Sequence, residues 1–312
     1  MAEAGNAEER GTDGIPGLMK EWHRPPLIGI FAFLAVLLTL PVAHSWSAFT
    51  REIIPAAASG PANFLLGLCG LGLLIYAIRD GQQETKGTLL GFISGLMLWT
   101  GWAAYMFAYN HMALGRPMMD ITPEQSRPLS LLFMQGSFGI CVATLLYFVL
   151  DKNTKCNAFR WLQRKLHLSF GRADSGQDRN FAKITFMETI YVTWFCYGFT
   201  LFLGDDRFLG YKHPATYVIV AAIGIWSLYL IWKLSKFTRI MAAIRYAIPT
   251  KALFWIVFGE YGPRLGWYKE FWLHPTEYTS EIIGVLAVTI ILLILPVYMP
   301  QRKQKVRTRP KV

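Results

Sequence analysis

The stretch PLIGIFAFLAVLLTLPVAHSWSAF, residues 26–49, contains no Asp, Glu, Lys or Arg. An α-helix needs about 20 residues to cross the roughly 30 Å hydrocarbon core of a bilayer, so this stretch is long enough to span a membrane. Lipid offers no hydrogen-bond partner to a bare backbone, and the crossing segment must therefore be helical. A polar leader, residues 1–25, precedes it, and the stretch exceeds the apolar core of a secretory signal peptide. We expect a retained membrane anchor.

Further apolar blocks of similar length follow along the chain. They are Pro61 to Ile78, Thr88 to Tyr109, Leu129 to Leu150, Ile184 to Leu203, Ala215 to Trp232 and Thr279 to Tyr298. Hydrophobic residues make up 53% of the chain, above the share of about 45–50% that is usual in soluble domains. The sequence therefore predicts an all-α fold, a polytopic transmembrane helical bundle with seven clear spans.

The lysines and arginines are distributed unevenly between the loops. The leader, the loop after the second block, the loop 151–183, the stretch 233–251 and the tail 299–312 hold all but seven of the 31. Cytoplasmic segments retain such cations, so we predict that both termini are cytoplasmic. The net charge of +11 is then a consequence of topology, and we predict no nucleic-acid partner, because no soluble domain organises the cations.

Two cytoplasmic termini require an even number of crossings, whereas the plain apolar blocks number seven. We predict that the additional crossing is a broken or re-entrant segment, Ala252 to Trp272, which is apolar at first but then carries Glu260 and Arg264. Buried charges cost a few kcal/mol each in a lipid-facing helix, so a break at Gly259, Gly262 and Pro263 is expected. The alternative is seven helices with the basic tail outside.

This topology divides the chain into a cytoplasmic leader (1–25), four spans (26–150), a basic cytoplasmic loop (151–183), the remaining spans (184–298) and a basic cytoplasmic tail (299–312). Two stretches place apolar residues at helical spacing beside cations, which predicts basic interfacial helices on the anionic leaflet. The first combines Phe159, Leu162 and Leu166 with Arg160, Arg164 and Lys165, and the second combines Phe237, Met241, Ile244 and Ile248 with Lys236, Arg239 and Arg245. Docking of a partner protein is the alternative.

Metal-capable side chains collect in the loops that this topology places outside. They are His111, Asp120, Asp206, His213 and His274. Imidazole and carboxylate ligands suit copper or another transition metal, so we consider a metal site on this face. The alternative is that these residues are solvated or cap helices. Bis-histidine haem is disfavoured, because His44 alone among the histidines lies within an apolar block.

Glu188 is an acidic residue inside a predicted span. Ionisable residues within membranes often serve function, which makes Glu188 a candidate proton or ion relay. Its position near the start of the block permits the alternative, in which the side chain extends to the cytoplasmic interface.

No catalytic motif is recognisable, so the sequence identifies no catalytic residue. The first hypothesis is a subunit of the bacterial inner (cytoplasmic) membrane that anchors or completes a larger complex, such as an oxidative or electron-transfer one, with membrane lipids and other membrane subunits as partners. The second is a transporter or channel that uses Glu188 and the segment 252–272. The third is a membrane metalloenzyme with the outer-face His and Asp residues.

Overall fold

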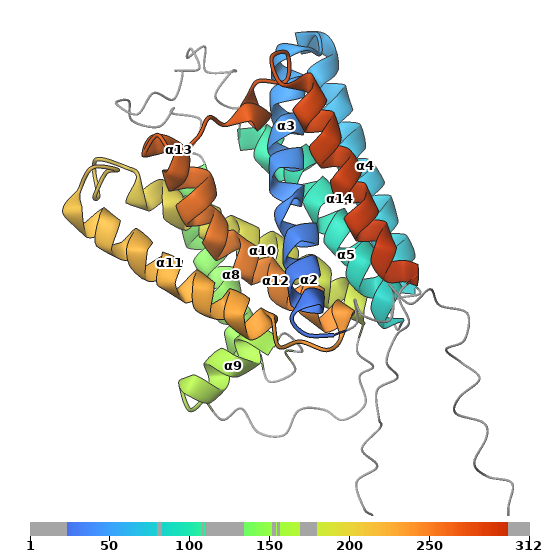
Figure 1. The fold of residues 1–312 in the computed structure, drawn as a ribbon, viewed down its shortest axis with the longest axis vertical. Helices are drawn as coiled ribbons and strands as arrows, with labels where there is room; N and C mark the ends of the chain where they lie inside the picture. The colour runs from blue at the N-terminus through green and yellow to red at the C-terminus, as the bar shows by residue number, and fades with distance from the viewer. Residues whose placement is uncertain are drawn as a thin grey trace, which may run out of the picture.

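The computed structural model describes residues 24–79, 83–107, 109, 134–151, 154, 157–168 and 180–298. Within these ranges the chain is helical and forms no strand, which confirms the predicted all-α bundle (Figure 1). Seven of the described segments are long and apolar enough to cross a membrane: Leu27–Glu52, Ala56–Arg79, Glu84–Phe107, Phe181–Leu203, Pro214–Leu234, Ile240–Arg264 and Thr279–Tyr298. A shorter apolar helix, Met134–Leu150, represents the predicted block that begins at Leu129.

Several of these segments combine more than one element. The first joins α2 (Leu27–Leu37) to α3 (Thr39–Glu52), and the third joins α5 (Glu84–Leu98) to the π-helix η1 (Trp99–Ala104). The sixth runs through α12 (Ile240–Trp255), the π-helix η2 (Ile256–Tyr261) and α13 (Gly262–Arg264). The remaining elements are α4 (Ala56–Arg79), α8 (Phe138–Leu150), α9 (Asn157–Lys165), α10 (Phe181–Leu203), α11 (Pro214–Leu234), η3 (Phe271–Leu273) and α14 (Thr279–Tyr298).

The two ends of the bundle are distinguished by the helix ends and loops that lie there. Helix α2 begins and α14 ends at the end from which α9 projects, which we call the α9 end (Figure 1). The loop between α13 and α14 lies at the opposite end. Helix α9 is anchored to α8, because Gln163 Nε2 donates hydrogen bonds to the carbonyls of Val149 (2.8 Å) and Asp151 (3.1 Å). Its Arg160 and Arg164 are exposed, as expected for the first predicted interfacial helix.

The prediction of a second interfacial helix is wrong. Its apolar residues Met241, Ile244 and Ile248 belong to α12 and are fully buried in the central core of the bundle. The sixth span therefore begins at Ile240, not at the predicted Ala252. The same helical spacing of apolar residues is typical of a surface helix and of a buried one, and here other helices cover the apolar side.

The predicted break near Gly259 is a π-helical turn, and the helix continues to Arg264. Gly259 is required there for another reason: a Cβ atom at this position would lie 2.1 Å from the indole ring of Trp255. Single π turns inside α-helices occur frequently at functional sites.

Helices α5 and α10 approach each other closely at Gly91, where a Cβ atom would lie 2.5 Å from the carbonyl oxygen of Ala182. Small residues permit such backbone contact between membrane helices. We expect Gly91→Ala to lower the free energy of unfolding by about 1–3 kcal/mol, because backbone must move to relieve the clash. Gly72→Ala is the matched control, since its Cβ meets nothing within 4 Å. Equal thermal stability of the two variants in detergent would contradict the packing of α5 on α10.

Candidate functional site around Lys251

Lys251 lies in the middle of the sixth span and is 1% exposed. It follows the start of α12 by eleven residues, which places it about 16 Å along the helix at 1.5 Å per residue. Ile244, Ile248 and Ala252, all buried, surround it along α12. An ionisable side chain at this depth is costly to bury, and in membrane proteins it usually marks a substrate or ion pathway.

Within the part of the chain that the structure describes, the Lys251 ammonium has one hydrogen-bond acceptor, the hydroxyl of Thr39 on α3, at 3.3 Å. The Thr39 hydroxyl itself donates to the carbonyl of Val36 at 2.6 Å, so it presents a lone pair to the lysine. The ring of Phe92 on α5 lies 5.2 Å from the ammonium, within the range of a cation–π contact. Among the described residues, no ion pair joins Lys251 to a carboxylate.

The first span has an irregular turn next to Thr39, the residue that contacts Lys251. Residue Leu38 separates α2 from α3, and Pro41 has no N–H to donate to the carbonyl of Leu37 one turn earlier. The carbonyl of Leu38 accepts a hydrogen bond from the Thr289 hydroxyl of α14 at 3.5 Å. Backbone carbonyls and two threonine hydroxyls therefore lie beside Lys251 at this turn.

A second charged cluster lies on α12 toward the α9 end. Arg245 Nη2 pairs with Glu84 Oε1 of α5 at 2.6 Å, and Arg239 pairs with the other carboxylate oxygen. Arg245 also donates to the hydroxyl of Thr88 at 2.6 Å, and its guanidinium lies 4.9 Å from the ring of Phe181 on α10. One carboxylate thus ties the starts of α5 and α12 together, and we call this group the Glu84 clamp.

A third cluster lies on the same span at the opposite end. Arg264 Nη1 approaches Glu260 Oε2 at 3.5 Å, and both side chains are largely buried. The Arg264 guanidinium lies 4.5 Å from the ring of Tyr211, which precedes α11. Arg245, Lys251 and Glu260 are separated by six and nine residues, so about 9 Å and 14 Å of helix lie between them. The sixth span carries ionisable groups from one end of the bundle to the other.

Glu188, the predicted relay residue, lies on α10 between Phe181 and Cys196. Phe181, whose ring lies 4.9 Å from the Arg245 guanidinium, precedes it by seven residues, and Cys196 follows it by eight. These spacings place all three on one face of the helix. The Oε2 atom of Glu188 is buried, and both the relay and its interfacial alternative stay predictions.

The described part of the candidate metal set does not assemble a site. His111 and Asp120 lie outside the described residues. Among the described residues no group of three or more His, Cys, Asp or Glu side chains is placed to hold a metal ion. His213 caps α11, because its Nδ1 accepts a hydrogen bond from the Ala215 N–H at 3.2 Å. Asp206 lies against Gly210. The backbone carbonyl of His274 accepts hydrogen bonds from backbone N–H groups in the loop before α14.

Asp205, next to the predicted Asp206, has the strongest polar contacts of this loop. Arg207 Nε donates to Asp205 Oδ1 at 2.9 Å. Gln135 Nε2, at the start of the short apolar helix Met134–Leu150, donates to Asp205 Oδ2 at 2.9 Å. The hydrogen bonds from Arg207 hold the pKa of the Asp205 carboxyl well below its usual range. The carboxylate therefore links the loop to Gln135.

This link predicts a loss of stability in acid. Because the folded pKa is lower than that of an unfolded Asp, near 3.9, the contribution is present above about pH 4 and is lost as the pH falls toward the folded value. We expect this contribution to the free energy of unfolding to be at most about 1 kcal/mol, as for other partly exposed ion pairs. Thermal unfolding at pH 7 and pH 3 should show a larger acid-induced loss for the wild type than for Asp205→Asn. The same loss in both proteins would contradict this role.

The fold and the buried cations together define a polytopic α-helical membrane protein. Comparison with models of known protein families, with curated proteins and with solved structures finds no match to this chain.

Proposed function

We propose that this protein is a proton-coupled transporter in which Lys251 is the central ion-carrying residue. The observation that carries the proposal is the position of Lys251, which lies mid-span, is 1% exposed and donates a hydrogen bond to the Thr39 hydroxyl. A lysine changes its charge by binding or releasing one proton, so a lysine at this depth can couple proton movement to that of a solute. Retaining such a residue inside the bundle is costly, which points to a role in activity.

The two other clusters would control access to Lys251 from the two ends of the bundle. The Glu84 clamp joins α5 and α12 at the α9 end, and Arg264 with Glu260 and Tyr211 closes the opposite end. Lys251 is 1% exposed, so in this proposal its exposure to either side follows the separation of one of these clusters. The irregular turn at Leu38 and the π turn at Ile256–Tyr261 are the points at which the two facing spans would move.

The charge distribution supports an orientation with the α9 end in the cytoplasm. This end carries exposed cations on α9, the cations Lys233 and Lys236 at the end of α11, and Arg239 at the start of α12. Cytoplasmic loops retain such residues, and in a bacterium this orientation corresponds to the inner membrane with both termini inside. Exposed Arg160 and Arg164 on α9 fit contact with anionic lipid head groups, as predicted for an interfacial helix.

Proton movement in reconstituted vesicles tests the proposal. Purified protein is placed in liposomes that contain a pH-sensitive dye, and gradients of Na⁺, K⁺, chloride or acetate are imposed in turn. At least one gradient should change the internal pH faster than in protein-free liposomes, and Lys251→Met should abolish the difference. Exposed Lys212→Met is the matched control and should retain it. Wild-type vesicles that behave as protein-free ones under all four gradients would contradict a proton-coupled function.

Assembly into a larger membrane complex stays a prediction. Helices α11 and α14 are the least buried of the long spans, with 17% and 11% of their apolar windows covered inside the bundle. Lipid or another membrane subunit covers such faces equally well. The mass of the protein extracted in mild detergent, compared with that of the single chain, distinguishes the two.

A further inference from the structure

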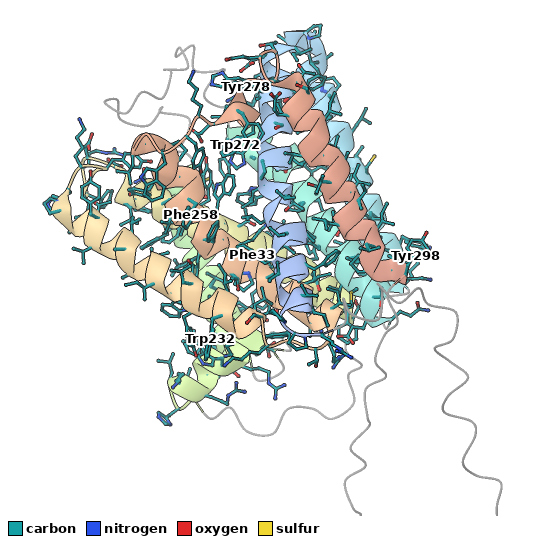
Figure 2. The ribbon with its side chains drawn as sticks, in the orientation of Figure 1. Phe33, Trp232, Phe258, Trp272, Tyr278 and Tyr298 are labelled. Atoms are coloured by element: carbon teal, nitrogen blue, oxygen red, sulfur yellow. The ribbon has the colours of Figure 1, made fainter. Side chains whose placement is uncertain are left out.

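A group of stacked rings lies between the first span and the sixth, toward the end opposite α9. The imidazole of His44 on α3 stacks on the indole of Trp255 at 5.5 Å between ring centres, and Trp272 of η3 lies 5.1 Å from Trp255. Figure 2 shows Phe33, Phe258 and Trp272 along the region in which these two spans face each other. We call His44, Trp255 and Trp272 the indole group.

Two hydrogen-bond donors of the indole group have no partner within the described ranges of the chain. The Nε1 atoms of Trp255 and Trp272 are both buried, and neither has a hydrogen-bond partner among the described residues. Trp272 as a whole is 5% exposed. A buried N–H that makes no hydrogen bond is costly, and native proteins rarely keep two such groups in contacting side chains without a functional reason.

His44 adds a polar atom of the opposite kind. Its Nδ1 lies 2.8 Å from the carbonyl oxygen of Leu40, and since a carbonyl only accepts, Nδ1 carries the hydrogen. In the neutral ring Nε2 therefore has a lone pair and accepts hydrogen bonds. The indole group thus offers two indole donors and one imidazole acceptor on three flat aromatic rings.

The surroundings define how a ligand would enter. The indole group lies within the apolar bundle. There the ring of Phe254 stacks on that of Phe258 at 4.2 Å between ring centres and meets the ring of Phe33 at 5.3 Å. Phe258, which is 36% exposed, lies 5.7 Å from the ring of Trp267, which is 54% exposed, so the aromatic surface continues to the outside of the bundle. A ligand that reaches the indole group from the bilayer would be lipid-soluble and would leave an apolar tail along these rings.

We propose that His44, Trp255 and Trp272 bind the head group of a lipid-soluble quinone. A quinone ring is flat and stacks on indole and imidazole, and its carbonyl oxygens accept hydrogen bonds from the two Nε1–H groups. The reduced form presents hydroxyl groups, one of which donates to His44 Nε2. Trp255 follows Lys251 by one helical turn, so the bound ring would lie close to the Lys251 site, although the proposal does not depend on transport by Lys251.

Quinone binding to the full-length protein in detergent tests the proposal. Decylubiquinone should quench tryptophan fluorescence with saturation, and Trp255→Phe and Trp272→Phe, which keep an aromatic ring but remove one donor, should each weaken binding about 5- to 10-fold. Trp226→Phe on α11, where the ring is 54% exposed, is the matched control and should bind as the wild type does. Decylbenzene has the same tail without carbonyl groups and should not compete.

A second measurement does not depend on the stability of the variants. Decylubiquinone should raise the midpoint of thermal unfolding of the wild type, because it binds the folded state alone, and decylbenzene should not. Quenching that never saturates, equal affinity in the Trp255, Trp272 and Trp226 variants, or equal effects of decylbenzene would each overturn the proposal.

Discussion

Lys251→Met should fold, resist heat better than the wild type and carry no protons. Methionine has nearly the length of lysine and fills the same space between Ile248, Phe92 and Thr39 without bringing a charge into the bundle. Replacing buried ionic groups by apolar side chains of similar volume is often neutral or stabilises a protein by about 1–4 kcal/mol. We expect a gain of about 1 kcal/mol or more in the free energy of unfolding.

This combination distinguishes a functional lysine from a structural one. If Lys251 served to hold α12 against α3 through Thr39, its replacement would lower the thermal midpoint together with the activity. Thermal unfolding of Lys251→Met, of Lys212→Met and of the wild type in one detergent measures the difference. A midpoint for Lys251→Met well below that of the wild type would show that the lysine is structural.

Breaking the Glu84 clamp should have the largest destabilising effect. Arg245→Met leaves the Glu84 carboxylate, which is only 22% exposed, with Arg239 as its remaining partner. Loss of one partner from a buried ion pair costs about 3–5 kcal/mol, because the other charge loses its compensation. Since Glu84 retains Arg239, we expect the lower part of this range. Denaturation of Arg245→Met, followed by far-UV circular dichroism, measures the loss.

Two further variants locate the effect within the clamp. Arg239→Met should cost less than about 1 kcal/mol, because Arg239 is 34% exposed and water replaces its contact with Glu84. The double variant Glu84→Gln with Arg245→Met should recover part of the stability lost in Arg245→Met, since no buried charge then remains uncompensated. An Arg239→Met variant as unstable as Arg245→Met would contradict the assignment of Arg245 as the buried partner.

The membrane-spanning bundle could be predicted from the sequence because apolar blocks and the loop cations are local signals. Lys251 could not be placed from those signals alone. The charge rule treats each cation as a mark of the cytoplasmic side, so it places Arg245 and Lys251 in a loop and the additional span in the residues after them. A signal was present: from Ile240 to Gly259 these two cations are the only charged residues, and that stretch is as long as a span.

What makes this stretch a span lies elsewhere in the chain. The carboxylate that neutralises Arg245 is Glu84, more than 150 residues earlier, and the hydroxyl that meets Lys251 is Thr39, still further away. Spacing within α12 carries no information about either contact. The indole group likewise joins His44 to two tryptophans in the last third of the chain, and single-residue patterns do not reveal which aromatic rings meet.

The position of Lys251 within the membrane is tested most directly by the accessibility of introduced cysteines. In a background without the native cysteines, Lys236→Cys, Lys251→Cys and Lys269→Cys are exposed to a membrane-impermeant maleimide, first from one side of sealed vesicles and then from the other. Lys236→Cys and Lys269→Cys should react from opposite sides, because they flank the span Ile240–Arg264, and Lys251→Cys should react from neither. Reaction of Lys236→Cys and Lys269→Cys from the same side, or rapid reaction of Lys251→Cys from the side of Lys236, would contradict a sixth span with Lys251 at its centre.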